Sequence, residues 1–256
     1  MKPHTQTRRE MLTASGGLLG ASLLSMPVFS QGEEGSRPSL KILVAGAHPD
    51  DPESGCGGTI CKMASLGHEV VVLYLTRGEA GIPGTSHEEA ARIRTAEAEA
   101  ACRVMDARPR FASQVDGSTV INSGTYKEIT SIIEEEAPDV VFTHWPIDTH
   151  RDHRICSNLL YDVWNRFRWN DQKAFDLYYY EVLTGEQSQH FQPTHFIDIT
   201  EFAAEKKEAT LMHVSQKASE WFSYHEKMDE FRGFQYPVRC KYAEAFFRQG
   251  FSRGPV

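Results

Sequence analysis

Mainly apolar runs of strand length alternate with segments of helical spacing along most of the chain. Leu40–Ala47 and Glu69–Thr76 are two such runs, and the segment between them has apolar residues on one helical face before it stops at Gly67. A strand, a helix and a second strand of this size form a βαβ unit. Strands that are apolar on both faces suit a parallel sheet that helices cover on both sides.

The same alternation continues toward the C-terminus. The further predicted elements are strands over Pro109–Val115, Asp139–His144, Phe175–Val182 and His195–Ile199, and helices that begin at Ser86, Thr125, Arg151 and Thr200. The helix from Thr200 is expected to be long and polar. We therefore expect an α/β fold, a single domain with a Rossmann-like, mostly parallel sheet and helices on both faces. The GCGG at 55–58 does not match a dinucleotide-binding fingerprint.

The first thirty residues differ in character from the rest of the chain. The basic pair Arg8-Arg9 precedes an apolar stretch, Met11–Pro27, and small residues suited to signal peptidase follow at Val28 and Ser30. This arrangement resembles a twin-arginine export signal over residues 1–30. The apolar stretch is short and glycine-rich for a bilayer span, so a permanent membrane anchor is not expected. A buried amphipathic helix is the alternative.

This interpretation divides the chain into three parts. The signal peptide is followed by a polar leader over residues 31–38, which we expect to be disordered, and then by one domain over residues 39–256. It also predicts a bacterial protein that is exported, after folding, to the periplasm or the extracellular space.

Composition narrows the classes of partner. The 256 residues carry a net charge of −8, with 40% hydrophobic and 24% charged residues, and no basic stripe with interleaved aromatic residues is present. Nucleic acid and anionic membrane surfaces are therefore not expected as partners. The five cysteines form no CxxC pair, which suggests free or buried thiols, and we interpret Cys56 as a core residue rather than a ligand.

Histidines and carboxylates cluster after two of the predicted strands, Leu40–Ala47 and Asp139–His144. The clusters are His48, Asp50 and Asp51, and then Asp148, His150, Asp152 and His153. Because the carboxyl ends of parallel strands meet at one edge of a sheet, both clusters are expected there. Zinc accepts mixed imidazole and carboxylate ligands, whereas Mg²⁺ and Ca²⁺ prefer oxygen, so this inventory favours a zinc site.

Spacing reduces the choice of ligands without settling it. His48 and Asp51 are three residues apart at a strand-to-helix turn, and His150 and His153 are three apart at a helix start. A catalytic zinc site usually has three protein ligands and an open position for water. One of the two histidines and one of the two aspartates are then free for proton transfer. The alternative is that these are ordinary surface histidines and helix-capping aspartates. Two clusters at corresponding strand ends argue against this alternative.

Specific short motifs occur in a fixed order along the chain. They are HPDD at 48–51, LTRGEAG at 75–81, Arg94 with Glu97, DTHRDH at 148–153, FIDIT at 196–200 and HVSQ at 213–216. Together they resemble the PIG-L (LmbE-like) zinc deacetylases over about Leu40 to Gln216. The chain departs from the family pattern at Met105-Asp106, where many members have Leu-Gly, and at Pro52, which separates the aspartates from Glu53.

The resemblance implies a set of ligands and a base. The implied zinc ligands are His48, Asp51 and His153, and the implied general base that activates water is Asp50. Zinc offsets the charge of the acidic cluster, and its proximity is expected to hold the pKa of Asp50 low.

The resemblance also implies roles around the base. His150 would be a cation that protonates or stabilises the tetrahedral intermediate. Asp152 would orient the His150 ring or favour its charged form, and so raise its pKa. Arg94 would contact substrate, and a simple helix pair between Arg94 and Glu97 is an equal alternative.

The implied activity is hydrolytic removal of an acetyl group from an N-acetylglucosamine-type sugar or glycoconjugate. The alternatives are a zinc amidase on another N-acyl or thiol-conjugate substrate and a non-catalytic secreted sugar-binding module. A two-metal phosphoesterase is disfavoured because a second set of ligands is missing. The sequence is compatible with a homo-oligomer and does not specify one.

Overall fold

The structure is a computed structural model that describes residues 39–170 and 173–250. The signal peptide predicted over residues 1–30 and the leader over 31–38 lie outside these residues. Among the residues that the structure describes, no helix is both long and apolar enough to cross a membrane.

A seven-stranded sheet forms the centre of the domain, in the order β3-β2-β1-β4-β5-β7-β6. The strands are β1 (Lys41–Gly46), β2 (Glu69–Tyr74), β3 (Arg108–Phe111), β4 (Val140–His144), β5 (Asp176–Tyr180), β6 (His195–Asp198) and β7 (Ala243–Gln249). The strands β1 to β5 are parallel, and β7 pairs antiparallel with both β5 and β6. The expected mostly parallel sheet is confirmed.

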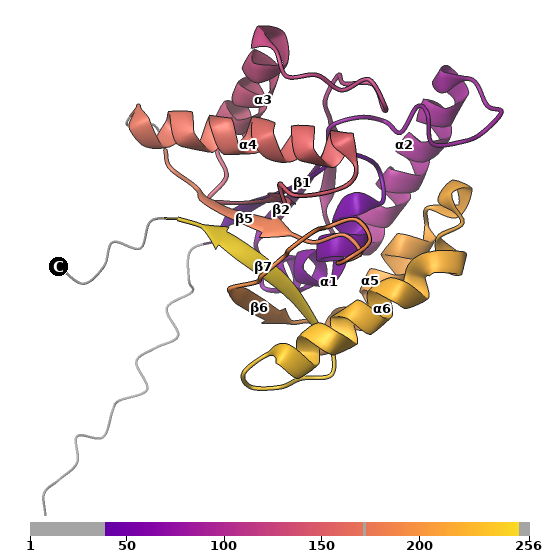
Figure 1. Ribbon diagram of the computed structural model, residues 1–256, viewed down its shortest axis with the longest axis vertical. Helices are drawn as coiled ribbons and strands as arrows, with labels where there is room; N and C mark the ends of the chain where they lie inside the picture. Colours follow the sequence, from indigo (N-terminus) through magenta and orange to yellow (C-terminus); the bar gives the residue numbers. More distant parts are fainter. Residues whose placement is uncertain (1–38, 171–172, 251–256) are drawn as a thin grey trace, which may run out of the picture. The chain divides into compact units, whose positions relative to one another are not determined.

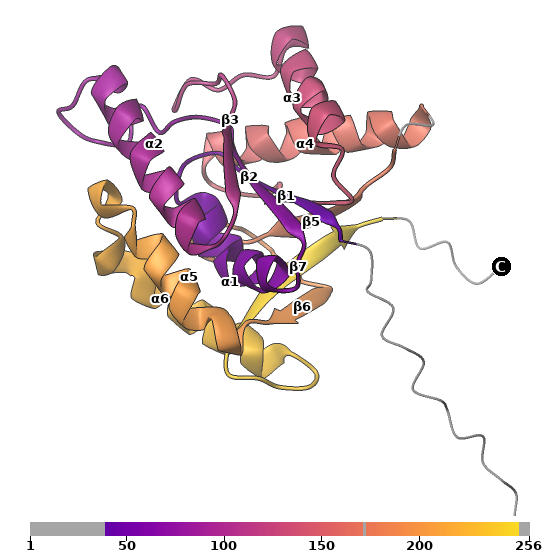
Figure 2. The same ribbon diagram turned by 180° about the vertical axis from the view of Figure 1, so that it is seen from behind.

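Helices cover both faces of this sheet, as predicted (Figures 1 and 2). They are α1 (Asp51–Ser65), α2 (His87–Val104), α3 (Ser123–Glu136), α4 (Arg151–Trp169), α5 (Ala203–Leu211) and α6 (Ala218–Gln235), with short 3₁₀ turns η2 (Thr200–Phe202) and η3 (Val214–Gln216). Successive residues of β1 point to opposite faces: Leu43 packs in the core under α3 and α4, and Val44 in the core under α1, α2 and α5.

The predicted long helix from Thr200 is wrong. The segment instead forms η2, α5, η3 and α6, and its chain direction changes at Lys217, whose φ is +54°. The interruption has a clear cause, because His213 is completely buried between α5 and η3 and cannot lie on a polar helix surface.

Helix α1 packs unusually close to its neighbours, which explains the glycines in GCGG. A Cβ on Gly58 would lie 2.7 Å from the Ile199 side chain, and one on Gly55 would lie 2.4 Å from the Tyr180 ring. The backbone N–H groups of Gly58 and Thr59 donate to the buried Glu244 carboxylate of β7, at 3.0 and 2.7 Å. The glycines therefore serve helix packing rather than nucleotide binding.

The five cysteines are free, as expected, and Cys56 is a fully buried core residue.

Candidate active site

The first cluster lies on a tight turn between β1 and α1. The turn needs Gly46, because a Cβ there would lie 2.6 Å from the Pro52 ring. The Asp51 side chain folds back and accepts the His48 backbone N–H at 2.8 Å. Asp51 is also the first residue of α1, so the positive end of the helix dipole faces its carboxylate.

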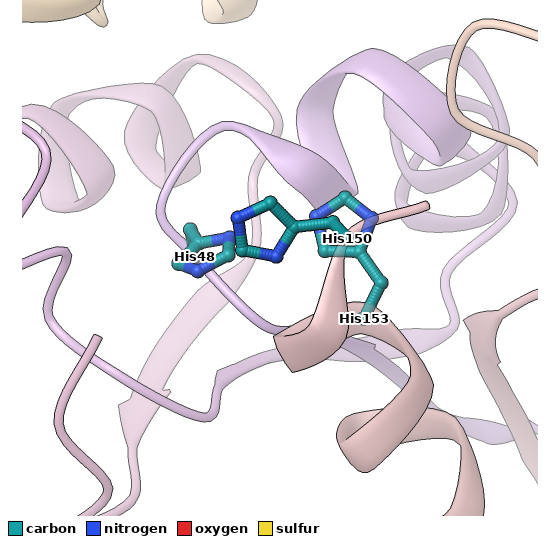
Figure 3. Close-up of side chains that lie close together, drawn as sticks. All are labelled: His48, His150 and His153. Atoms are coloured by element: carbon teal, nitrogen blue, oxygen red, sulfur yellow. The ribbon is translucent and has the colours of Figure 1, made fainter. Parts of the chain in front are cut away.

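The second cluster lies where α4 begins after β4. His150 is the N-cap residue of α4, and its ring accepts the Asp152 backbone N–H at 3.2 Å. His153 occupies the first turn of the same helix. The rings of His48, His150 and His153 lie close together (Figure 3), with centroids 4.8 Å apart for His48 and His150 and 4.6 Å for His150 and His153. The two clusters therefore meet at one sheet edge, as the sequence predicts.

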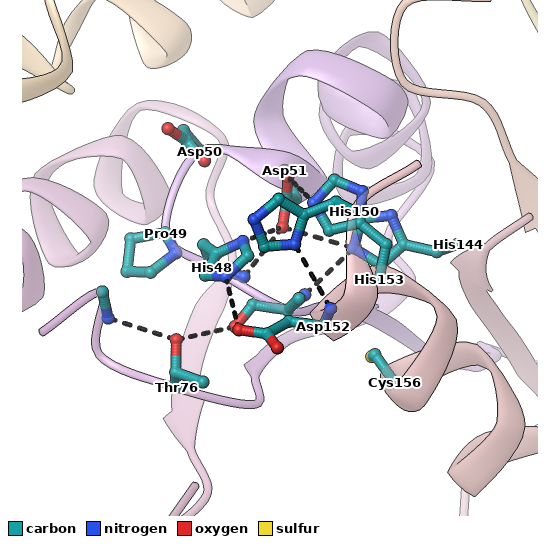
Figure 4. A network of polar contacts seen from close by, with 12 residues as sticks. His48, Pro49, Asp50, Asp51, Thr76, His144, His150, Asp152, His153 and Cys156 are labelled. Carbon is teal, nitrogen blue, oxygen red and sulfur yellow. Dashed lines mark hydrogen bonds and ion pairs between the residues drawn. The ribbon is translucent and has the colours of Figure 1, made fainter. Parts of the chain in front are cut away.

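Three overlapping sets of donor atoms among the described residues could hold a metal ion. The sets are His48, His150 and His153; Asp51, His144 and His153; and His48, Asp116 and Asp152, with the atoms of each set within 4.8 Å of one another. The predicted ligands His48, Asp51 and His153 are divided between these sets. Both oxygens of Asp51 face imidazoles, with Oδ2 at 3.2 Å from His48 Nδ1 and Oδ1 at 3.3 Å from His153 Nε2 (Figure 4).

The electrostatics of this centre favour positive charge. Burial alone would raise the pKa of Asp51, but His153 and His144 hold it well below its usual value. Burial likewise opposes the charged form of His153, yet Asp51 and Asp148 raise its pKa to about 9. The carboxylates thus draw protons onto His153 and likewise raise the pKa of His48, and a metal cation would supply the same charge. Donor chemistry and electrostatics both fit a bound metal.

Asp50 stands apart from the imidazoles (Figure 4) and lines the cavity of the site. Its side chain is 20% exposed, and its Oδ2 accepts Arg94 Nη2 at 3.1 Å. Burial raises the pKa of Asp50 to about 6, although the Arg94 guanidinium opposes this rise. The protein surroundings thus act in the opposite direction to the lowering that the sequence analysis expects from zinc.

Asp152 has a different partner from the one expected. Its carboxylate accepts the Gly117 N–H at 2.7 Å and the Thr119 hydroxyl at 2.6 Å, and it lies 3.3 Å from His48 Nε2. Only its backbone N–H reaches His150.

The expectation that His150 is a cation is also wrong. Burial, followed by the neighbouring His48 and His153, lowers the pKa of His150, and Asp152 raises it too weakly to reverse this. Since Nδ1 accepts a backbone N–H, the proton of the neutral ring lies on Nε2.

Arg94 lies where a substrate contact is expected. Its guanidinium donates to the Pro49 carbonyl and to Asp50, and it lines a cavity of about 350 Å³ above the two clusters. This volume is in the range of small-ligand sites. The alternative pair with Glu97 does not explain its position, because Glu97 instead accepts the Ser215 N–H and hydroxyl, at 2.7 and 2.6 Å. Substrate contact by Arg94 stays a prediction.

Sequence reasoning missed His144, the last residue of β4. Its Nε2 accepts the Ala47 N–H at 3.0 Å, and its ring stacks on His153 with centroids 4.0 Å apart. Burial, followed by the nearby His153, lowers the pKa of His144 to about 4, so the ring is neutral at pH 7. A polar residue that ends an otherwise apolar strand was the available signal.

The chain is similar to known proteins in both sequence and structure. The profile of the family described as GlcNAc-PI de-N-acetylase (PIG-L) matches residues 43–164. The diacetylchitobiose deacetylase of Thermococcus kodakarensis is 30% identical over 189 residues, which are 69% of this chain and 70% of that protein. A 1D-myo-inositol 2-acetamido-2-deoxy-alpha-D-glucopyranoside deacetylase of Kineococcus radiotolerans is 36% identical over 91 residues, 33% of this chain and 25% of that protein. The solved N,N'-diacetylchitobiose deacetylase of Pyrococcus horikoshii superposes with a TM-score of 0.73 at 25% identity, over 83% of this chain and 84% of that one.

Proposed function

The chain belongs to the GlcNAc-PI de-N-acetylase (PIG-L) family, and from this membership we propose that it removes the acetyl group from an N-acetylglucosamine-type saccharide or glycoconjugate with zinc as its metal. It is a metal-dependent deacetylase, a hydrolase of non-peptide amide bonds. Relatives named for diacetylchitobiose and for an inositol-linked acetamido sugar support this substrate class.

The observation that carries the proposal is the pairing of two imidazoles with one carboxylate. His48 Nδ1 and His153 Nε2 lie 3.2 and 3.3 Å from different oxygens of Asp51. These three side chains would hold the zinc. When bound, the ion would polarise the amide carbonyl and lower the pKa of a water molecule.

Asp50 is suited to take a proton from the attacking water. With its pKa near 6, the carboxylate is largely ionised at neutral pH and still basic enough to accept a proton in the transition state. Arg94 donates to its Oδ2, which restrains the side chain and leaves Oδ1 for the water. The proton that Asp50 gains is the one that the departing sugar amine needs.

His150 is suited to donate a hydrogen bond to the developing oxyanion. Its Nδ1 accepts the Asp152 N–H, so a neutral ring carries its proton on Nε2. A neutral donor of this kind stabilises the oxyanion without a stable positive charge in a site that already holds a cation. Asp152 then acts on the metal side, through His48, rather than on His150.

The residues before the described part support a proposal on location. The basic pair and the apolar stretch that follows it are typical of a twin-arginine signal, and such a signal would send a bacterial deacetylase to the periplasm or beyond.

One experiment tests the proposed activity. Purified protein, loaded with zinc or treated with chelator, is incubated with N-acetylglucosamine, N,N'-diacetylchitobiose and longer N-acetylated oligosaccharides, and free acetate is measured. We expect acetate release that needs metal and that falls sharply in D50N. A sugar-binding module would bind these saccharides with or without the substitution and release no acetate. An amidase of other specificity would release acid only from N-acyl compounds outside the panel.

A further inference from the structure

The backbone of Asp50 has a conformation that needs support from its surroundings. Its φ is +112° and its ψ is −27°, in the region that side-chain-bearing residues rarely adopt. Such a conformation is strained and persists only where neighbouring groups hold it. The groups that hold it also determine where the Asp50 carboxylate points.

Glu53 supports this turn from inside the protein. Its side chain is fully buried beneath the first turn of α1, and its Oε2 accepts the Asp50 backbone N–H at 3.2 Å. Its other oxygen, Oε1, accepts the Tyr74 hydroxyl at 2.5 Å. Glu53 therefore links the strained residue to strand β2. A buried carboxylate is costly unless donors surround its oxygens, so a further partner is expected.

His213 supplies that partner from a distant part of the chain. It is fully buried, and its Nε2 lies 3.0 Å from Glu53 Oε1. The same short segment is attached to α2, because Ser215 donates to Glu97 at 2.7 and 2.6 Å. Helix α2 also carries Arg94, which donates to the Asp50 carboxylate at 3.1 Å.

We propose that Glu53 and His213 are positioning residues that hold the backbone of Asp50 in its left-handed conformation and thereby aim its carboxylate at the attacking water. The proposal rests on the proposed function, in which Asp50 is the base. It gives a role to the HVSQ motif and to Glu53, neither of which contacts the three proposed ligands. Displacement of a reacting group by about 1 Å costs on the order of 10²-fold in rate.

A matched pair of substitutions tests the role of His213. In H213Q the amide nitrogen occupies the place of Nε2 and keeps a donor for Glu53, whereas in H213N the amide stops near the place of Nδ1. We expect H213N to lower kcat for acetate release from N,N'-diacetylchitobiose by about 10–100-fold with KM and zinc content unchanged. H213Q should stay within a few-fold of the parent protein. E53Q has one acceptor oxygen where Glu53 uses two, so either the Asp50 N–H or the Tyr74 hydroxyl loses its acceptor. It should resemble H213N, and it replaces H213N if that variant does not fold.

A second measurement distinguishes positioning from a general loss of structure. It is the effect of H213N on the residual rate of a protein that already carries D50N. If His213 acts through the Asp50 carboxylate, H213N lowers the residual rate of D50N by less than about threefold, because the group to be aimed is already gone. An equal loss in both backgrounds would show a structural role and overturn the proposal. Parent-like kcat in both H213N and E53Q, with D50N inactive, would overturn it too and leave the proposed function intact. Full activity in D50N would overturn both.

Discussion

Replacement of Asp50 by asparagine should make the protein more stable and nearly inactive. Asparagine has the size of aspartate and tolerates left-handed backbone conformations, so D50N preserves the turn, which alanine would strain. Its amide oxygen can still accept Arg94 Nη2. The substitution thus removes the charge and the basicity of the side chain and little else.

The magnitude of the stability change follows from the pKa. Burial raises the pKa of Asp50 from 3.8 to about 6 in the folded protein. A raised folded pKa means that the folded state binds the proton more tightly, so ionisation destabilises it. The penalty is absent below about pH 4, grows as the pH rises toward 6, and reaches at most about 3 kcal/mol at pH 7. Urea unfolding of both proteins after chelation, at pH 4 and at pH 7, measures it without a cation to offset it. A difference in unfolding free energy that does not grow with pH would refute the reasoning.

The change in activity of D50N tests the role of the same carboxylate as a general base. Loss of a general base costs about 10²–10⁴-fold, which is about 3–5 kcal/mol of transition-state stabilisation. The parent rate should rise with pH through about 6 as Asp50 ionises, and D50N should lack this acid limb. Acetate release by D50N within tenfold of the parent, or an unchanged acid limb, would show that Asp50 is not the base.

The other expected outcomes concern the metal, the core and the leader. Elemental analysis should find about one zinc per chain in the parent and in H150A but a clear loss in H153A, while H150A loses about 10²–10³-fold in kcat; the opposite pattern of zinc loss would exchange the two roles. Lys206 is 1% exposed between two carboxylates at 2.8 Å, so K206M should lower the free energy of unfolding by about 3–5 kcal/mol in urea, and a change below 1 kcal/mol would contradict this. Changing Arg8 and Arg9 to lysine should retain the precursor in the cytoplasm on cell fractionation, and normal export would exclude a twin-arginine signal.

The parts of the fold that local pattern encodes were predictable. β1 and β2 are apolar on both faces because both faces are covered, and β1, α1 and β2 form the predicted βαβ unit. Strand β7 was missed because its signal is mixed: the core-facing Glu244 is charged, and it is stable there only through Lys206 and two N–H groups of α1. Partners so distant in the chain cannot be read from the sequence.

In the site, too, local pattern predicted some features, and contacts between distant residues determine the others. Parallel strand ends predicted that the two clusters would meet, and they do. The side-chain partner of Asp152 was not predictable, because it depends on how the loop at Gly117–Thr119 lies against the start of α4. The burial of His213, which interrupts the predicted helix, likewise depends on Glu53, 160 positions earlier in the chain.

Each of these imidazoles has a remote nitrogen, the one that points away from the proposed metal site. The partner of this nitrogen distinguishes the ligands His48 and His153 from His150. Carboxylates face the remote nitrogens of His48 and His153: Asp116 and Asp152 lie 3.1 and 3.3 Å from His48 Nε2, and Asp148 lies 3.2 Å from His153 Nδ1. A carboxylate holds a proton on the nitrogen that it faces, so the opposite nitrogen has a free lone pair. In both residues this opposite nitrogen is the one directed at Asp51.

A backbone N–H group faces His150 instead. The Asp152 N–H points at His150 Nδ1, so this ring uses that lone pair within the protein. The free nitrogen of the neutral ring then carries a proton and is a donor rather than a ligand. For His150 this donor serves an oxyanion. The spacing of His150 and His153 leaves open which of the two binds metal, and the nature of their hydrogen-bond partners favours His153.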